Sequence, residues 1–201
     1  CFLIYLYITR GYQKEMYALA FTDKLTGVRN FAKFRQDGEE RLQAADGLPC
    51  ALLSINMLNF KIFNDVMGYS EGDALLKAFA RILEREAPRP VLVARMLADA
   101  FLVLFPYEEK EDLVAYCEAY SRALNDFIMS RKQNYQLELR SGICCVEDGG
   151  VSDINSLLDR ANMALQTIKR KGAAQWKFYD RTMRDKLLRE KDLEIRMEKA
   201  L

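Results

Sequence analysis

The order in which strand-like and helix-like segments alternate constrains the fold of this chain more than any other feature. From about residue 30 onward, apolar residues recur with helical spacing in some stretches and with the density of buried strands in others. The order is strand, helix, helix, strand, strand, helix, strand, helix, strand, between two flanking helices. This order predicts a mixed five-stranded sheet covered by helices, an α+β fold with α/β character.

The expected elements follow from apolar periodicity and from Gly and Pro punctuation. Helices are expected at residues 31–44, 59–67, 69–86, 110–131 and 153–171, and strands at 50–58, 135–147 and 175–180, with a hairpin at 91–105. Near the start of the helix expected at 69–86, Ser70 and Asp73 have the spacing of an S-x-x-D capping box.

The hairpin reads "ARMLADAFLVL" and is expected to turn on a two-residue corner, Leu97 and Ala98. Tight corners usually require Gly or Asn, because the backbone must adopt a positive φ. A single carboxylate, Asp99, stands between alanines at this tip, so the hairpin carries one isolated acid in an apolar setting.

Composition excludes several classes of function. The 201 residues carry a net charge of +1, which gives no basic field for binding nucleic acid. The chain has no histidine, so Ser-His-Asp and Cys-His catalysis are excluded, and a zinc site would have only cysteines and carboxylates. No two of the five cysteines have C-x-x-C spacing. An odd number of cysteines without such a pair is typical of reduced thiols in a protein core.

The two ends of the chain differ in character from the centre. Residues 1–18 predict a linker helix, which is either the cytoplasmic end of a transmembrane segment or a helix packed on its own domain. Residues 181–201 predict a charged linker helix, of a kind that joins domains or pairs with a copy of itself.

Three ordered motifs resemble those of the GGDEF domain, the diguanylate cyclase module of bacterial cyclic-di-GMP signalling. "FTDKLTGVRN" is similar to the D-x-L-T-G-x-x-N opening, "NMLNFKIFNDVMGYSEGDALL" to the D-x-D-x-F-K-x-x-N-D segment and its continuation, and "ANMALQTIKRKG" to the A-D-x-A-L-Y-x-A-K helix. The resemblance covers about residues 19–180 and implies the nucleotidyl-cyclase palm-type fold. "LADAF" then stands where the family carries its Gly-Gly-(Asp/Glu)-Glu-Phe signature.

The resemblance implies a magnesium site that has lost most of its charge. The positions that match the family's Mg²⁺ ligands are Asn56, Met57 and Asp99, and we interpret them as vestigial. Leu58 replaces the second Asp of D-x-D, and Ala100 replaces an acid that the family is thought to use in catalysis. If these losses together cost roughly 5–6 kcal/mol, the rate falls about ten-thousandfold. We therefore expect no catalytic residue here, and Mg²⁺ that binds weakly or not at all.

The nucleotide-binding positions are better preserved, and GTP or GDP is the ligand that the resemblance implies. The matching residues are Asn64, Asp73, Phe60, Lys61 and Lys169. Three of these residues each have a structural alternative to nucleotide binding. In these alternatives Asp73 caps its helix, Asn64 hydrogen-bonds the end of its short helix, and Lys169 offsets the charge of a helix C-terminus. The family's inhibitory product site, R-x-x-D, would fall at residues 88–91 and is absent.

The charged tail resembles the helix that leads into the EAL phosphodiesterase in composite GGDEF–EAL proteins. The resemblance implies an inactive regulatory domain in the cytoplasm, part of a membrane-anchored protein, that relays signals to an EAL domain of the same chain or dimerises it. Two alternatives stay open: a GTP-sensing allosteric domain, and a weakly active cyclase that uses Asn56 and Asp99. A homodimer is compatible with each alternative.

Overall fold

The computed structural model describes residues 16, 20–44, 48–131, 135, 137–146, 153–168, 175–185 and 189. Most of the expected N-terminal linker helix, residues 1–18, lies outside the described residues, as does most of the expected C-terminal helix after residue 185. Residues 181–185 are helical, in agreement with the start of that C-terminal helix.

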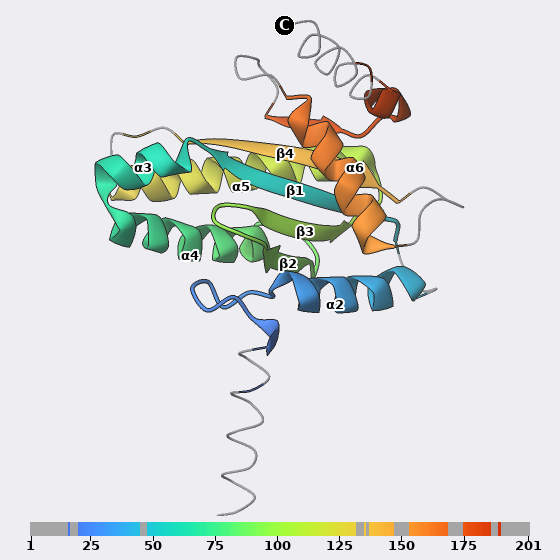
Figure 1. Cartoon of the computed structure of the whole chain (residues 1–201), viewed down its shortest axis with the longest axis horizontal. Coiled ribbons are helices and arrows are strands. Elements are labelled where there is room, and N and C mark those ends of the chain that lie inside the picture. Colours follow the sequence, from blue (N-terminus) through green and yellow to red (C-terminus); the bar gives the residue numbers. More distant parts are fainter. Residues whose placement is uncertain are drawn as a thin grey trace, which may run out of the picture.

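The elements lie close to the expected positions (Figure 1). The helices are α2 (Phe31–Gln43), α3 (Phe60–Met67), α4 (Tyr69–Arg85), α5 (Lys110–Ser130) and α6 (Ile154–Gln166). The strands are β1 (Cys50–Leu58), β2 (Leu92–Arg95), β3 (Phe101–Pro106), β4 (Glu138–Cys145) and β5 (Trp176–Phe178).

The strands form one five-stranded mixed sheet in the order β2-β3-β1-β4-β5, which confirms the expected fold class. β1 lies in the centre and pairs antiparallel with β3 and β4, while β5 pairs parallel with β4 at one edge. β1 can occupy this central position because its residues are apolar without interruption from Cys50 to Leu53 and alternate thereafter.

Two hydrophobic layers cover the two faces of the sheet. On one face, α4 and α5 pack against alternate residues of β1, such as Leu53 and Ile55. On the other face, α2 and α6 pack against the intervening residues, such as Leu52. The two-residue period of the strand thus supplies both layers of a helix–sheet–helix sandwich.

Close contact between α6 and the sheet depends on a glycine of β4. A Cβ atom at Gly142 would lie 1.9 Å from the carbonyl oxygen of Ala161, so a larger residue would collide with the helix backbone. Beside it, the Ser54 hydroxyl donates a hydrogen bond of 2.7 Å to the Asn162 side chain of α6. This contact fixes the position of α6 over the centre of the sheet.

Two local expectations are wrong. The capping box does not form, because α4 begins at Tyr69 after Gly68, whose φ of 89° lets α3 and α4 follow one another directly, and Ser70 and Asp73 lie inside the helix. The hairpin corner is longer than two residues, since the Met96 amide donates to the Ala100 carbonyl oxygen at 2.9 Å and encloses the three residues 97–99.

Candidate functional site

One end of the sheet gathers the segments that stood out in the sequence. The pairing of Ile55 with Phe101 places the end of β1 beside the β2–β3 hairpin loop. There the Met57 amide donates a hydrogen bond of 3.0 Å to a carboxylate oxygen of Asp99. The structure thus brings Asp99 next to the end of β1, where Asn56 and Met57 lie.

The hairpin loop holds a strained backbone. Ala98 has a φ of 51°, a left-handed conformation that costs a non-glycine residue about 1–2 kcal/mol. The Leu97 side chain is 79% exposed, and its carbonyl oxygen accepts a hydrogen bond of 2.9 Å from the Ala100 amide. The loop therefore needs support from outside its own sequence.

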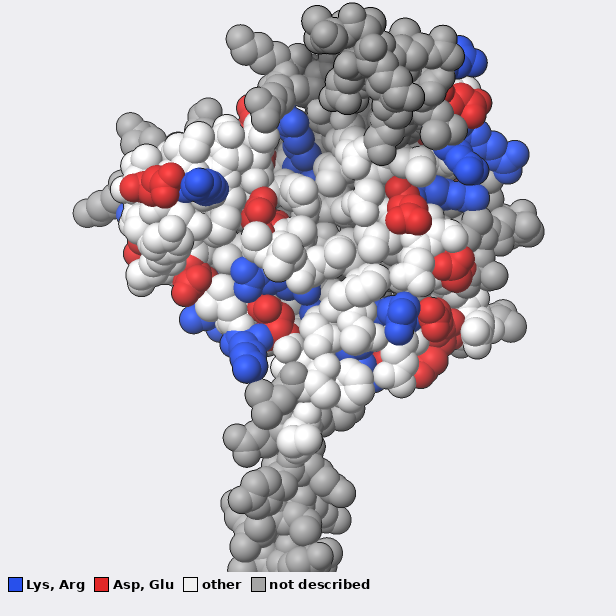
Figure 2. All heavy atoms as spheres, viewed as in Figure 1, with Lys and Arg blue, Asp and Glu red and all other residues white. Residues whose placement is uncertain are grey.

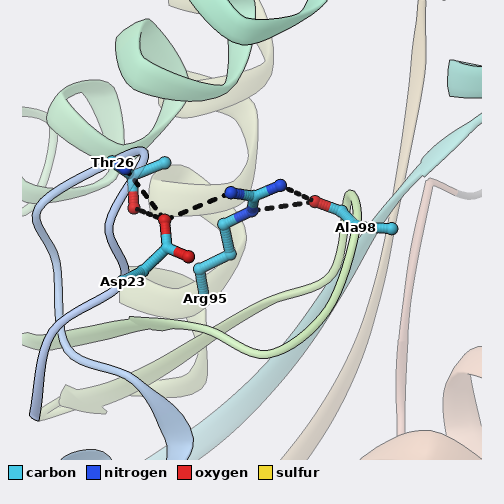
Figure 3. A network of polar contacts seen from close by, with 4 residues as sticks. All are labelled: Asp23, Thr26, Arg95 and Ala98. Atoms are coloured by element: carbon cyan, nitrogen blue, oxygen red, sulfur yellow. Dashed lines mark hydrogen bonds and ion pairs between the residues drawn. The ribbon is translucent and has the colours of Figure 1, made fainter. Parts of the chain in front are cut away.

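Arg95 supplies this support (Figure 3). Its Nε and one terminal nitrogen donate to the Ala98 carbonyl oxygen at 2.8 and 2.6 Å. Its other terminal nitrogen reaches Asp23 Oδ1 at 3.1 Å. One guanidinium thus joins the hairpin loop to the turn that follows residue 22.

Asp23 is the acceptor at the centre of that turn. Its Oδ1 atom accepts hydrogen bonds from the Thr26 amide at 2.8 Å and the Thr26 hydroxyl at 2.7 Å, besides the contact with Arg95. Partial burial by itself would raise the pKa of Asp23, but these donors and the Arg95 charge outweigh it and lower the pKa below its ordinary value. Asp23 is therefore an ionised structural partner of Arg95.

The residues at the end of β1 offer little negative charge to Mg²⁺. The donor set combines one carboxylate, Asp99, with the neutral oxygens of Asn56 and Met57, whereas proteins usually hold Mg²⁺ by one or two carboxylates together with substrate phosphates and waters. Arg140 pairs with Asn56 across the β1–β4 ladder, and its guanidinium lies 4.0 Å from a carboxylate oxygen of Glu138 and donates to the Ile168 carbonyl oxygen at 3.5 Å. Among the described residues, no three His, Cys, Asp or Glu side chains are grouped to hold a metal ion.

The second group of expected residues lies between α3 and α4. Asn64 is half-buried, and its side-chain oxygen is fully buried without a hydrogen-bond partner. A Cβ atom at Gly72 would lie 1.9 Å from that oxygen, so the amide of Asn64 fits between the helices because position 72 is a glycine. The structural alternative for Asn64, a side-chain bond to the end of its own helix, is therefore wrong, because the backbone carbonyl makes that bond with Gly68.

The other expected nucleotide residues occupy different environments. Asp73 is exposed on α4 and does not cap it, so the structural alternative for Asp73 is also wrong. Phe60 is buried, with its ring stacked on Phe63 at 6.2 Å between centroids, and Lys61 is exposed at the start of α3. Lys169 lies outside the described residues.

The sequence reasoning did not identify Arg95 as a member of this site. One signal was present, because Asp23 and Thr26 have the spacing of a side-chain-capped turn. The partner of that turn could not be found from spacing, since Arg95 is 72 residues further along the chain.

Charges on the face shown in Figure 2 are mostly interspersed, with acidic and basic side chains alternating around a broad uncharged centre. Several basic side chains gather at the right of this view. Within the described part of the chain, no helix is both long and apolar enough to cross a membrane.

Comparison with known families gives one match that spans most of the chain. Residues 20–175 match the family described as "Diguanylate cyclase, GGDEF domain". A diguanylate cyclase of Vibrio cholerae is 26% identical over 162 residues, which cover 80% of this chain and 50% of that protein. The cyclic di-GMP phosphodiesterase NbdA of Pseudomonas aeruginosa is 23% identical over 185 residues, covering 91% of this chain and 24% of that protein.

Solved structures show the same fold. The coiled coil and GGDEF domain of DgcB from Caulobacter crescentus, in complex with c-di-GMP, superposes with a TM-score of 0.71 at 22% identity, covering 88% of this chain and 94% of that one. The S helix-GGDEF-EAL portion of Vibrio cholerae LapD, bound to c-di-GMP, gives a TM-score of 0.70 at 16% identity. The match covers 86% of this chain and 40% of that one.

The curated relatives are longer than this chain. It spans 27%, 50% and 23% of the lengths of three that it matches. The match therefore concerns one domain of such proteins.

Proposed function

The chain belongs to the GGDEF family of diguanylate cyclase domains, and from this premise we propose that it is a regulatory domain of cyclic-di-GMP signalling that does not make cyclic-di-GMP itself. The family reaction joins two GTP molecules and depends on charge neutralisation by metal ions and on accurate positioning of the phosphates. In this proposal the chain keeps the fold that surrounds the reaction site but has lost the residues that bind the metal ions and catalyse the reaction.

One observation carries this proposal. The carboxylate of Asp99, the acid left in the signature, accepts a hydrogen bond from the Met57 amide, and the neighbouring position on β1 carries a neutral amide, Asn56. At the tip, Leu97 and Ala98 add side chains where the family has two glycines. The site thus keeps one carboxylate, and added side chains stand where phosphoryl transfer would need an open backbone.

An activity assay tests the proposal. The purified chain, incubated with GTP and Mg²⁺, should give no cyclic-di-GMP, while a diguanylate cyclase of Vibrio cholerae gives product under the same conditions. Product formation by this chain, abolished in the Asp99→Ala variant, would refute the proposal and support the weakly active cyclase instead.

We also propose that the domain acts on an EAL phosphodiesterase that follows it in the same protein, which is anchored in a membrane. This part is supported by the relatives whose names include phosphodiesterase or EAL, and by the charged helical segment that begins at residue 181. The coding sequence beyond Leu201 tests it. An EAL domain is expected there, and an immediate stop codon would contradict the proposal.

A second candidate function is nucleotide sensing, which the unpartnered oxygen of Asn64 favours. A buried acceptor without a partner costs about 1–3 kcal/mol, and a side-chain rotation toward a purine edge would recover it. GTP would then bind between α3 and α4 and change the behaviour of the downstream domain.

Calorimetry separates nucleotide sensing from a purely structural role. Heat of GTP binding is expected for the native chain and for Lys77→Ala, an exposed change one turn further along α4, but not for Asp73→Ala. If the native chain shows no saturable heat, the sensing function is excluded and the non-catalytic proposal is unaffected.

A further inference from the structure

The two edges of the sheet differ in what covers them. At the β2 edge the entering segment extends the sheet, because Arg29 bridges to Ala94 and its carbonyl oxygen accepts a hydrogen bond of 3.0 Å from the Arg95 amide. At the other edge β5 pairs with β4 on one side, and no strand of the described chain pairs with its outer side. The outer side of β5 is therefore the open edge of the sheet.

The register of β5 on β4 decides which backbone groups of β5 point outward. The Ser141 amide donates to the Gln175 carbonyl oxygen at 2.9 Å, and the Tyr179 amide donates to the Ile143 carbonyl oxygen at 2.7 Å. In a parallel ladder of this register, every second residue from Gln175 to Tyr179 turns its backbone groups toward β4. The backbone groups of the residues in between therefore point to the open side.

Trp176 and Phe178 are these two residues, and each presents one N–H and one C=O group to the open side. Within the part of the chain that the structure describes, these four groups have no hydrogen-bond partner. Both side chains are half-buried and pack against the hydrophobic layer covered by α4 and α5, so the strand is held in place. An extended peptide laid antiparallel to β5 would give all four groups a partner.

Lys177, between these two residues, favours one kind of peptide. Its side chain is exposed on the face of β5 opposite to that of Trp176 and Phe178, and no carboxylate of the described residues forms an ion pair with it. If β5 of a second copy paired with this edge about a two-fold axis, each Lys177 would lie opposite the other, and like charges directly opposite destabilise a strand pair. A carboxylate in that place would be attracted instead.

From these observations we propose that the β5 edge binds an extended peptide of a partner protein as an added antiparallel strand. The peptide carries an acidic residue opposite Lys177 and an apolar residue on each side of it. These apolar residues lie opposite Trp176 and Phe178 and cover the exposed part of the two aromatic side chains. The proposal does not depend on the function proposed above.

The peptide Thr-Val-Glu-Val-Thr, acetylated and amidated at its ends, tests the proposal because its central carboxylate can lie opposite Lys177. We would titrate it into the whole chain and follow backbone amides by NMR. The Trp176 and Phe178 amides should shift with a dissociation constant of ~1 mM or tighter. The Arg95 amide, at the covered edge of the sheet, should not move. If the Trp176 and Phe178 amides show no saturable shift, the proposal is wrong.

Two altered peptides separate backbone pairing from charge. A peptide with N-methylated valines cannot donate hydrogen bonds to the Trp176 and Phe178 carbonyl oxygens, and it should bind at least about tenfold more weakly. A peptide with lysine in place of glutamate meets the charge of Lys177 and should bind at least about fivefold more weakly. Equal binding of the methylated peptide would exclude an added strand, and equal binding of the lysine peptide would exclude selection of an acidic residue. Either result overturns the proposal.

Matched variants of the chain define the location. Lys177→Glu changes an exposed side chain and should reverse the preference, so that the lysine peptide binds at least about fivefold more tightly than the glutamate peptide. Lys77→Glu, an exposed change on α4, should keep the native preference. Unchanged amide resonances away from β5 show that each variant is folded. A Lys177→Glu chain that still prefers the glutamate peptide would place the peptide elsewhere and overturn the proposal.

A dilution series of the chain without peptide tests the alternative occupant. The Trp176 and Phe178 amides should keep their positions at all protein concentrations, because Lys177 disfavours pairing with a second copy. Shifts of these two amides that grow with protein concentration would show that a second copy occupies the edge, contrary to the proposal.

Discussion

Arg95 is the residue on which the geometry of the hairpin loop depends. It holds the Ala98 carbonyl with two hydrogen bonds and reaches Asp23 in a segment that comes 72 residues earlier in the sequence. Because Ala98 has a left-handed backbone, the loop would relax without this contact. The loop therefore takes its shape from the Arg95 side chain, which Asp23 in turn contacts across the fold, where the family's glycines would allow that shape without a side chain.

The pair of Asp23 and Arg95 predicts a specific dependence of stability on pH. The pKa of Asp23 is lower in the folded chain than in the unfolded chain, so Asp23 stabilises the fold at neutral pH and loses this effect as the pH falls through its folded pKa. Between about pH 5 and about pH 2, the native chain should lose more unfolding free energy than Asp23→Asn, which has no charge to lose.

Urea unfolding at a series of pH values measures this difference. Thr26→Val provides the control, because it removes one donor to Asp23 but keeps the ion pair with Arg95, and it should give an intermediate slope. Parallel curves for the native chain and Asp23→Asn would show that the contact in Figure 3 does not form in solution.

At the scale of elements, the sequence predicted most of the structure because each element carries its own signals. The expected strand at residues 50–58 is β1 without change, since an apolar run after Pro49 leaves little choice of boundary. The expected start of α4 at residue 69 is correct, but the capping box at Ser70 and Asp73 is not, because the chain enters the helix through Gly68 and only the backbone of that glycine shows that two helices adjoin. Arg95 was missed because its role exists only once the hairpin and the Asp23 turn are side by side.

The contact of α6 with β4 leads to a prediction about glycines. Gly142→Ala should lower the unfolding free energy by about 2–3 kcal/mol or more, because its Cβ would meet the backbone carbonyl of Ala161 and push the helix from the sheet. Gly38→Ala on α2 is the matched control. Its Cβ would meet side-chain atoms alone, Ile154 Cδ1 at 2.6 Å, Ile154 Cγ1 at 3.0 Å and Leu104 Cδ2 at 3.7 Å, which shift more easily than a helix backbone, and alanine favours the helix by about 1 kcal/mol.

Thermal and chemical unfolding of the two variants give the comparison. Equal losses for Gly142→Ala and Gly38→Ala would mean that α6 adapts to the added methyl group as easily as a side chain does. The close packing of α6 on β4 would then not be a determinant of stability.

For the molecule as a whole, stability comes from two hydrophobic layers on opposite sides of one sheet. Cys117 lies in the layer under α5 and is fully buried, and burial raises the pKa of its thiol to about 12. Cys145 is half-buried at the end of β4. The reactivity of Cys117 therefore reports on opening of the hydrophobic layer, while that of Cys145 reports on local exposure at the end of β4.

Alkylation should follow this difference. At about pH 8, a thiol with a raised pKa and no solvent contact reacts only when the chain unfolds, so Cys117 should be modified at the rate of global unfolding. Mass spectrometry of peptides from iodoacetamide-treated protein measures it. Modification of Cys117 as fast as that of Cys145 without denaturant would show that the layer under α5 opens locally.

The direction of β5 separates two ends of the domain, one at the hairpin loop and one where the chain leaves the sheet. Since β4 runs antiparallel to β1, and β5 runs with β4, the chain leaves the sheet at the end opposite Asp99 and the hairpin. Arg29, by contrast, joins the edge of the sheet at Ala94, close to the hairpin. A structural change that begins near the entering segment would have to travel the length of β1, nine residues or roughly 30 Å, to reach the departing one. The central strand β1 therefore separates the two ends of the domain by its full length.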